Sequence, residues 1–128
     1  MYGFFTTLQG DFDDIVGRVT EALKVEGFGV LTTIDVKQTL KEKLNLDKRP
    51  YTILGACNPP LANQALEADP NIGLLLPCNV IVREDEDGSI TVGFMDPQAV
   101  LSLGEFPGIA ELAEQVSEKL QRVKVALG

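Results

Sequence analysis

The chain has 128 residues and a mass of 13.9 kDa, enough for a single domain with its own hydrophobic core. Hydrophobic residues make up 45% and charged residues 23%, a composition that excludes disordered and fibrous proteins. Because the net charge is −8, the average surface repels nucleic-acid phosphates and anionic lipids. We therefore expect neither a nucleic acid nor a membrane as a partner.

Several kinds of segment and site are missing from the sequence. The start of the chain lacks the basic stretch of a secretory signal, and no apolar run reaches the roughly 18 residues of a membrane-spanning helix. Two cysteines do not form a disulfide framework, so we expect a cytoplasmic protein. The absence of histidine excludes Ser/His/Asp and Cys/His catalytic arrangements. From these features we expect no cofactor and no metal site.

The first part of the chain predicts a strand followed by an amphipathic helix. Residues 2–7 are aromatic and β-branched, as strand residues often are, and Gly10 ends this run. Asp11 is placed to cap a helix that continues to Gly27, a residue suited to a left-handed helix stop. The apolar residues of this helix recur at spacings of three and four and define one buried face: Phe12, Ile15, Val16, Val19, Ala22 and Leu23.

A second strand and a second helix follow. Residues 28–34 predict a strand, and the apolar or β-branched residues expected on one side of it are Phe28, Val30, Thr32 and Ile34. Asp35, with Gln38 three residues later, forms a capping-box pattern at the start of the next helix. A narrow apolar seam repeats along that helix at Val36, Leu40 and Leu44. The polar segment 45–50 closes it.

The central part of the chain combines two apolar runs with prolines. Residues 51–57 alternate like a strand, and Asn58 followed by Pro59 is a strong helix start. Small residues on one face of this helix permit a close approach to the sheet. The apolar run 72–82 is interrupted by Pro77, so we expect a kink or bulge there and a regular strand after it.

The last part of the chain predicts a hairpin and two helices. The acidic segment 84–88 ends in Asp-Gly, a turn signal, and Asp96 with Pro97 starts a short helix that ends at Gly104. Pro107 opens a final helix whose apolar face contains Ile109, Leu112, Ala113, Val116, Leu120 and Val123. The sequence thus predicts a single α+β domain over residues 1–128, with a largely antiparallel sheet of about five strands and helices packed on it.

Three segments carry a resemblance to a known family. They are residues 27–30 (GFGV) with 35–37 (DVK), 53–59 (ILGACNP) and 76–80 (LPCNV). Together they resemble the domain of unknown function 302 family, and the resemblance extends from the first strand to about Met95. It implies a curved antiparallel sheet similar to the TATA-box-binding-protein-like architecture, without DNA binding. It implies no activity, because the family has no established one.

Cys57 and Cys78 each precede an asparagine, and two interpretations of them stay open. Free cysteines are most often buried in a core, where they behave as small hydrophobic residues. Alternatively, a thiol pair near a helix start would react or form a disulfide, as in a thiol-dependent enzyme or a redox-responsive protein. A structural zinc needs four ligands, and this chain offers two thiolates, so metal handling is the weakest interpretation.

Three polar residues are candidates for binding a ligand. Asn58 caps the helix that follows it, whereas Asn79 lies inside an apolar run and must find partners or face a cavity. Lys37, in the first turn of its helix, either faces solvent or joins the Asn58 helix start in binding a small anion. Each Cys-Asn pair adjoins a proline that interrupts regular pairing, so we expect the two pairs to lie close together and line one cavity.

The leading hypothesis is a non-catalytic domain that binds a small ligand or a partner beside the two Cys-Asn pairs. Amides, backbone donors and a helix N-terminus at one cavity favour a small anionic or carbonyl-bearing ligand. We also expect a homodimer, because a sheet with helices on one face leaves its other face or an edge uncovered. Whether the protein is an enzyme stays open, although no phosphate-binding loop or nucleophile elbow is present.

Overall fold

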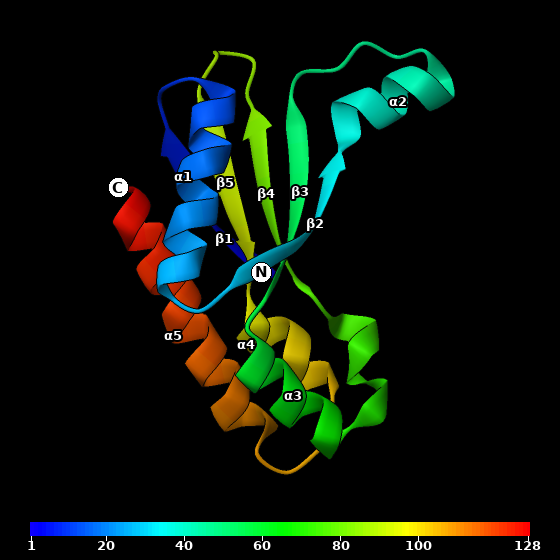
Figure 1. Cartoon of the computed structure of the whole chain (residues 1–128), viewed down its shortest axis with the longest axis vertical. Coiled ribbons are helices and arrows are strands. Elements are labelled where there is room, and N and C mark those ends of the chain that lie inside the picture. Colours follow the sequence, from blue (N-terminus) through cyan, green and yellow to red (C-terminus); the bar gives the residue numbers. More distant parts are fainter.

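A computed structural model describes all 128 residues, which form one five-stranded antiparallel sheet with helices packed on it (Figure 1). The strand order is β1-β5-β4-β3-β2, so the N-terminal strand lies on one edge and the second strand on the other. The strands are β1 (Gly3–Leu8), β2 (Gly29–Asp35), β3 (Tyr51–Cys57), β4 (Cys78–Glu84) and β5 (Ile90–Met95). The predicted fold class and strand number are confirmed.

Helices cover one face of this sheet and one of its ends. The longer ones are α1 (Phe12–Val25), α2 (Val36–Leu44), α3 (Pro59–Ala68) and α5 (Ile109–Leu127), and the short ones are η1 (Pro70–Leu75), α4 (Pro97–Val100) and η2 (Leu101–Leu103). Helices α1 and α5 lie side by side over the sheet, while α3, η1 and α4 gather at its lower end in Figure 1. None of these helices has the length and apolar character needed to cross a membrane.

The core lies between the sheet and the α1–α5 pair. Strand residues on the covered face are almost completely buried; Val80, Val82 and Val92 expose no measurable side-chain surface. On α5 the buried residues repeat at helical spacing and are Leu112, Ala113, Val116, Ser117, Leu120, Val123 and Leu127. Five of the six apolar residues predicted for this helix face are therefore buried, and Ile109 is partly buried at the helix start.

Local sequence signals place the helix boundaries as expected. The Asp11 carboxylate accepts a hydrogen bond from the Asp14 amide, and Gly27 adopts the left-handed conformation (φ +86°) that follows α1. The Asp35 carboxylate likewise caps α2 by accepting from the Gln38 amide at 2.9 Å. The Gln38 side chain donates to Glu42 and accepts no hydrogen bond from the Asp35 amide, so the capping box is incomplete.

Strand β2 departs from the predicted one-sided pattern. Val30 pairs with Ala56 and Thr32 pairs with Gly55, so the register shifts by one residue between them. Such a bulge places two residues opposite one on the neighbouring strand and moves the following side chains to the other face. Val30 therefore points to the covered face, whereas Thr32 and Ile34 point to the opposite one. The expectation that all four residues share one side of the sheet is wrong.

Two further segments differ from the sequence expectation. Residues before Pro77 form the 3-10 helix η1 rather than an extended run, because Asp69 caps this turn and Ile72 is buried within the core. A short apolar run does not by itself distinguish a strand from a helical turn. Helix α5 begins at Ile109, two residues after Pro107, with left-handed Gly108 at its start. The regular strand after Pro77 is confirmed as β4.

Candidate functional site

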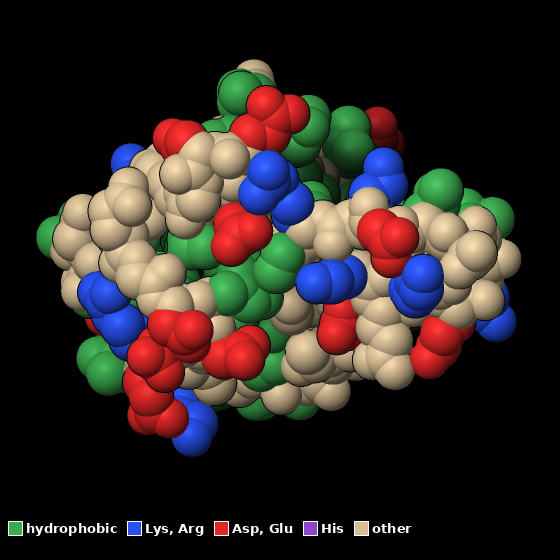
Figure 2. All heavy atoms as spheres, turned by 90° about the horizontal axis from the view of Figure 1, so that it is seen from above, with side chains coloured by type: hydrophobic (Ala, Val, Ile, Leu, Met, Phe, Trp, Pro, Cys, Tyr) green, Lys and Arg blue, Asp and Glu red, His purple; other side chains and the backbone are tan.

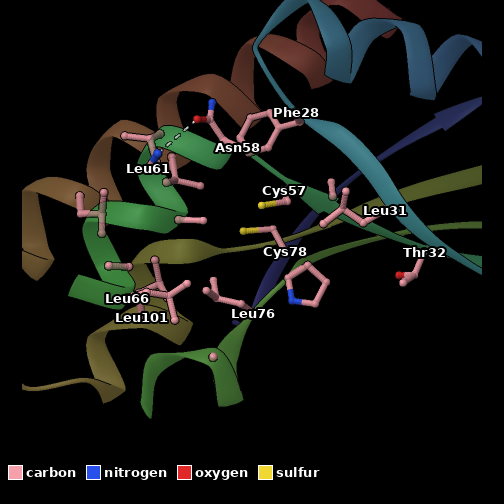
Figure 3. Close-up of a pocket in the computed structure, with 17 residues that line it drawn as sticks. Phe28, Leu31, Thr32, Cys57, Asn58, Leu61, Leu66, Leu76, Cys78 and Leu101 are labelled. Atoms are coloured by element: carbon pink, nitrogen blue, oxygen red, sulfur yellow. Dashed lines mark hydrogen bonds between the residues drawn. The ribbon is translucent and has the colours of Figure 1, made fainter. Parts of the chain in front are cut away.

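A cavity with a volume of about 340 Å³ opens at the end of the sheet where β3 ends and β4 begins (Figure 3). Its walls come from the bulged part of β2, the ends of β3 and β4, and helices α3 and α5. Seventeen residues line it and thirteen are hydrophobic, including Phe28, Leu31, Leu61, Leu66, Leu76, Leu101, Leu112 and Val116. The volume falls within the range of small-molecule binding pockets.

The residues that shape this cavity are small where elements come close together. Ala62 and Ala65 on α3 and Gly73 on η1 line the wall without filling it. Gly55 on β3 allows the Thr32 side chain and the Pro77 ring to lie against the strand, because a Cβ there would stand 2.1 Å from Thr32 Oγ1. The β2 bulge, in turn, brings Leu31 and Thr32 to the cavity.

Cys57 and Cys78 lie side by side in this cavity, and their sulfur atoms point the same way in Figure 3. Both are free thiols; Cys57 is half-buried and Cys78 is buried. Cys78 pairs with Ala56, which places it next to the end of β3. Burial, with a smaller contribution from the neighbouring Cys57, raises the pKa of Cys78 to about 12. At neutral pH Cys78 is therefore a protonated thiol and a poor nucleophile.

Asn58 also lines the cavity, but both ends of its amide are already engaged. Its Oδ1 accepts from the Leu61 amide at 3.4 Å, the bond drawn in Figure 3, and its Nδ2 donates to the Glu26 carbonyl at 3.3 Å. Asn58 thus caps α3 and ties its start to the loop after α1. The side-chain amide of Asn58 therefore forms hydrogen bonds within the protein and is not free to bind a ligand.

The start of α3 offers no free backbone donor to an anion. The first two helical residues are Pro59 and Pro60, which have no N–H group. The next amide, that of Leu61, donates to the Asn58 side chain, and the amide of Ala62 donates to the Asn58 carbonyl. This helix start therefore has no free N–H group among its first four residues for the small anion expected there.

Asn79 and Lys37 lie away from this cavity. Asn79 follows Cys78 on β4, and alternate residues of a strand face opposite sides of the sheet. It is exposed and lines a separate hollow of about 240 Å³ together with Phe5 and Ile81. Lys37 lines a third hollow of similar volume at the other end of the sheet, which it shares with three carboxylates: Asp11, Asp13 and Asp35.

The structure thus brings Cys57, Asn58 and Cys78 together at one cavity and separates Asn79 and Lys37 from it. Sequence reasoning missed the apolar walls, above all Leu31, which reaches the cavity only because β2 is bulged. The two Cys-Asn pairs with their adjoining prolines were the signal in the sequence that pointed to a cavity here. No residue pattern identified Leu76 or Leu101 as lining residues.

The acidic hairpin between β4 and β5 forms its own hydrogen-bonded turn. Asp85 accepts from the hydroxyls of Thr91 and Ser89 and pairs with Arg83, and the Thr91 bond is the largest cause of its lowered pKa. Asp87 caps the same turn by accepting from Ser89, which lowers the pKa of Asp87 as well. The carboxylates of this loop are therefore engaged with neighbouring donors, and no three potential metal ligands are grouped in the structure.

Comparisons with known proteins place this chain in a family. A solved structure described as an uncharacterized conserved protein DUF302 from Bacillus stearothermophilus matches with a TM-score of 0.91 and 29% identity, covering 100% of this chain and 99% of that one. An uncharacterized protein of Aquifex aeolicus (strain VF5) is 29% identical over 85 residues, 66% of this chain and 53% of the relative, so the chain matches only about half of that relative's length. The sequence model of the family described as "Domain of unknown function DUF302" matches residues 4–127, and the chain belongs to this family.

Proposed function

We propose that the protein is a non-catalytic binding domain for a small, uncharged and largely apolar molecule. The observation that carries the proposal is the wall of the cavity beside Cys57 and Cys78, where thirteen of seventeen residues are hydrophobic. A volume of about 340 Å³ suits a molecule of one or two rings or a short acyl chain. Transfer of such a molecule from water into apolar surroundings is favourable.

The polar groups at the cavity limit what the ligand can carry. The Asn58 amide is engaged at both ends, and the adjacent helix start has no free N–H group. The polar side-chain groups that remain to bind a ligand are the Thr32 hydroxyl and the two thiols. The hydroxyl has a single O–H donor, and a thiol is a weak donor. They suit one carbonyl oxygen, whereas a charged group would be buried without a partner. Of the two ligand types expected from sequence, this favours the carbonyl-bearing one over the anionic one.

A pair of fluorescent probes with the same aromatic scaffold tests this proposal. N-phenyl-1-naphthylamine is neutral, and 1-anilinonaphthalene-8-sulfonate adds a sulfonate to that scaffold. We expect the neutral probe to bind saturably at one site per chain and the sulfonate to bind at least tenfold more weakly. Equal affinity for both probes, or no saturable binding of the neutral one, would refute the proposal.

A cavity-filling variant shows whether the probe occupies this cavity. Gly73 lines it, and a Cβ at Gly73 would meet only the Leu66 side chain, at 3.9 Å. Gly73→Leu therefore adds apolar volume to the cavity without a backbone clash and should weaken binding at least tenfold. Gly17→Leu is the matched control, because Gly17 lies on α1 with no atom within 4 Å of an added Cβ. This control should bind the probe as the parent does.

A redox response of the same cavity is a second candidate, favoured by the two thiols that lie side by side (Figure 3). In this reaction one thiol attacks oxidised glutathione and forms a mixed disulfide, and the second thiol then displaces the remaining glutathione. The glutathione S–S bond breaks, the two glutathione sulfurs take the two electrons and two protons, and a Cys57–Cys78 disulfide forms. The raised pKa of Cys78 opposes its own attack, so Cys57 would be the attacking thiol. Equilibration with glutathione buffers followed by peptide mass spectrometry detects the bond. A cytoplasmic location would keep the thiols reduced.

A further inference from the structure

The sheet face opposite α1 and α5 carries a row of apolar residues across all five strands. Phe5 pairs with Gly93, Gly93 with Ile81, Ile81 with Ile53, and Ile53 with Ile34. Directly paired residues point to the same face, so the row is continuous from one edge of the sheet to the other. Phe5 is 39% and Ile34 48% exposed. We call Phe5, Ile81, Ile53 and Ile34 the apolar stripe.

Close packing of Phe5 against Ile81 gives this stripe a defined shape. A Cβ added at Gly93 would stand 2.8 Å from the Phe5 ring and 2.9 Å from Ile81 Cγ1. The absence of a side chain at Gly93 therefore lets the Phe5 ring lie down on the sheet and against Ile81. A hollow of about 240 Å³ opens beside this contact. The stripe thus has both an apolar surface and a shape into which another side chain fits.

A second uncovered apolar surface lies on the segment 36–50, which we call the arm. It consists of α2 and the loop after it, and Figure 1 shows it projecting beyond the β2–β3 edge of the sheet. No residue of α2 is buried, and Leu44 and Leu46 are 62% and 42% exposed. A nine-residue helix is marginal on its own, and packing of an apolar seam is what stabilises such helices.

The arm is basic, whereas the rest of the chain is strongly acidic. Five of the eleven Lys and Arg residues lie within 36–50, together with only two of the nineteen Asp and Glu residues. The arm therefore carries a charge of +3 and the remainder of the chain −11. In Figure 2 the right-hand lobe, which is the arm, shows several Lys and Arg side chains with a few acidic ones between them, whereas acidic side chains cluster at the lower left. Lys37, Lys43 and Lys48 form no ion pair within the chain.

We propose that two copies of this chain form a reciprocal dimer in which the arm of each copy packs on the apolar stripe of the other. The seam of the arm and the stripe are both apolar and both partly exposed, and each copy carries one of each. The stripe itself is uncharged, but the arm carries +3 and the remainder of the chain −11, so an arm is attracted to a partner body as a whole and repelled by a partner arm. In a dimer with a two-fold axis, each arm contacts the stripe of the other copy, so the same two surfaces form both contacts.

Sedimentation velocity of the full chain at micromolar concentration tests the dimer. The expected mass is about twice 13.9 kDa, and dissociation should increase with salt because the attraction between arm and body is screened. Leu44→Glu places a carboxylate in the seam and should give a monomer. Val125→Glu is the matched control, because Val125 is 77% exposed on α5, away from both surfaces, and should remain a dimer. A monomeric parent, or a dimer that Leu44→Glu leaves intact, overturns the proposal.

Mixing two monomeric variants tests which surfaces meet. Leu44→Glu disables the arm and Phe5→Lys disables the stripe, so each variant alone loses both contacts of the reciprocal dimer. In a mixed dimer, the intact arm of the Phe5→Lys chain meets the intact stripe of the Leu44→Glu chain, and one contact is restored. We expect a heterodimer only in the mixture. A mixture that stays monomeric contradicts arm-on-stripe packing. If Phe5→Lys unfolds in a thermal melt, Ile34→Lys replaces it.

Discussion

Replacement of Gly55 by alanine tests how the β2 bulge and the cavity are held together. The added Cβ would stand 2.1 Å from Thr32 Oγ1 and 2.9 Å from Pro77 Cγ, both closer than side-chain contacts normally come. Thr32 is β-branched, so two of its three staggered χ1 positions place a heavy atom toward Gly55. The Pro77 ring cannot rotate away. The neighbouring chain must therefore shift for the methyl group to fit.

The magnitude of this effect follows from two opposing contributions. Overpacking in a well-packed region costs about 1–3 kcal/mol of folding free energy. Replacing glycine by alanine also lowers the conformational entropy of the unfolded chain, which raises the free energy of unfolding by about 0.4–1 kcal/mol. We therefore expect Gly55→Ala to lower the free energy of unfolding by about 1–2 kcal/mol. Removing the hydroxyl with Thr32→Ala should recover about half of that loss, because the Pro77 contact remains.

Urea unfolding followed by circular dichroism measures these free energies. Gly29→Ala is the matched control, because Gly29 also lies in a strand of this sheet but has no atom within 4 Å of an added Cβ. It should leave the stability unchanged or raise it slightly. A Gly55→Ala protein as stable as Gly29→Ala, or a loss of stability that is the same with and without Thr32→Ala, would contradict a clash at Thr32.

Three further changes probe the core, the thiol and the cap. Leu112→Ala should lower the free energy of unfolding by about 2–4 kcal/mol, since the side chain is 6% exposed; an unchanged thermal melt would show that α5 is not docked there. The pKa of Cys78 is raised from its ordinary value of 9.0 to about 12, so the folded protein holds this proton more tightly than the unfolded chain. Its contribution to stability is complete below pH 9 and is lost between pH 9 and 12 at about 1.4 kcal/mol per pH unit. Urea unfolding at several alkaline pH values should show a shallower decline for Cys78→Ala than for the parent, and equal slopes would contradict this. Asn58→Ala should lower the stability by about 1–2 kcal/mol and Asn58→Asp by less, because aspartate keeps the cap to Leu61 but loses the donor to Glu26. The same loss in both variants would argue against a role for the cap.

Most of the fold could be predicted from the sequence because its signals are local. The helix caps at Asp11, Asp35 and Asn58 and the turn at Gly88 each depend on a few neighbouring residues, and all four are present in the structure. The bulge in β2 could not be predicted in this way. It depends on Gly55 of the neighbouring strand, and the spacing of side chains along β2 alone suggested a regular strand.

The candidate site was predicted in part, for a similar reason. The expectation that the two Cys-Asn pairs meet was right for Cys57, Asn58 and Cys78 but not for Asn79, which strand alternation turns to the opposite face. The chemistry of the site depends on which donors are free. That could not be known until the partners of Asn58 were seen, because a cap and a ligand compete for the same amide.

The most direct test of the binding proposal is a crystal structure of the protein with the neutral probe N-phenyl-1-naphthylamine. We expect electron density for the probe between Cys57, Leu66 and Leu76, with no charged side chain in contact with it. Density in the hollow beside Asn79, or a cavity that stays empty at saturating probe, would contradict it.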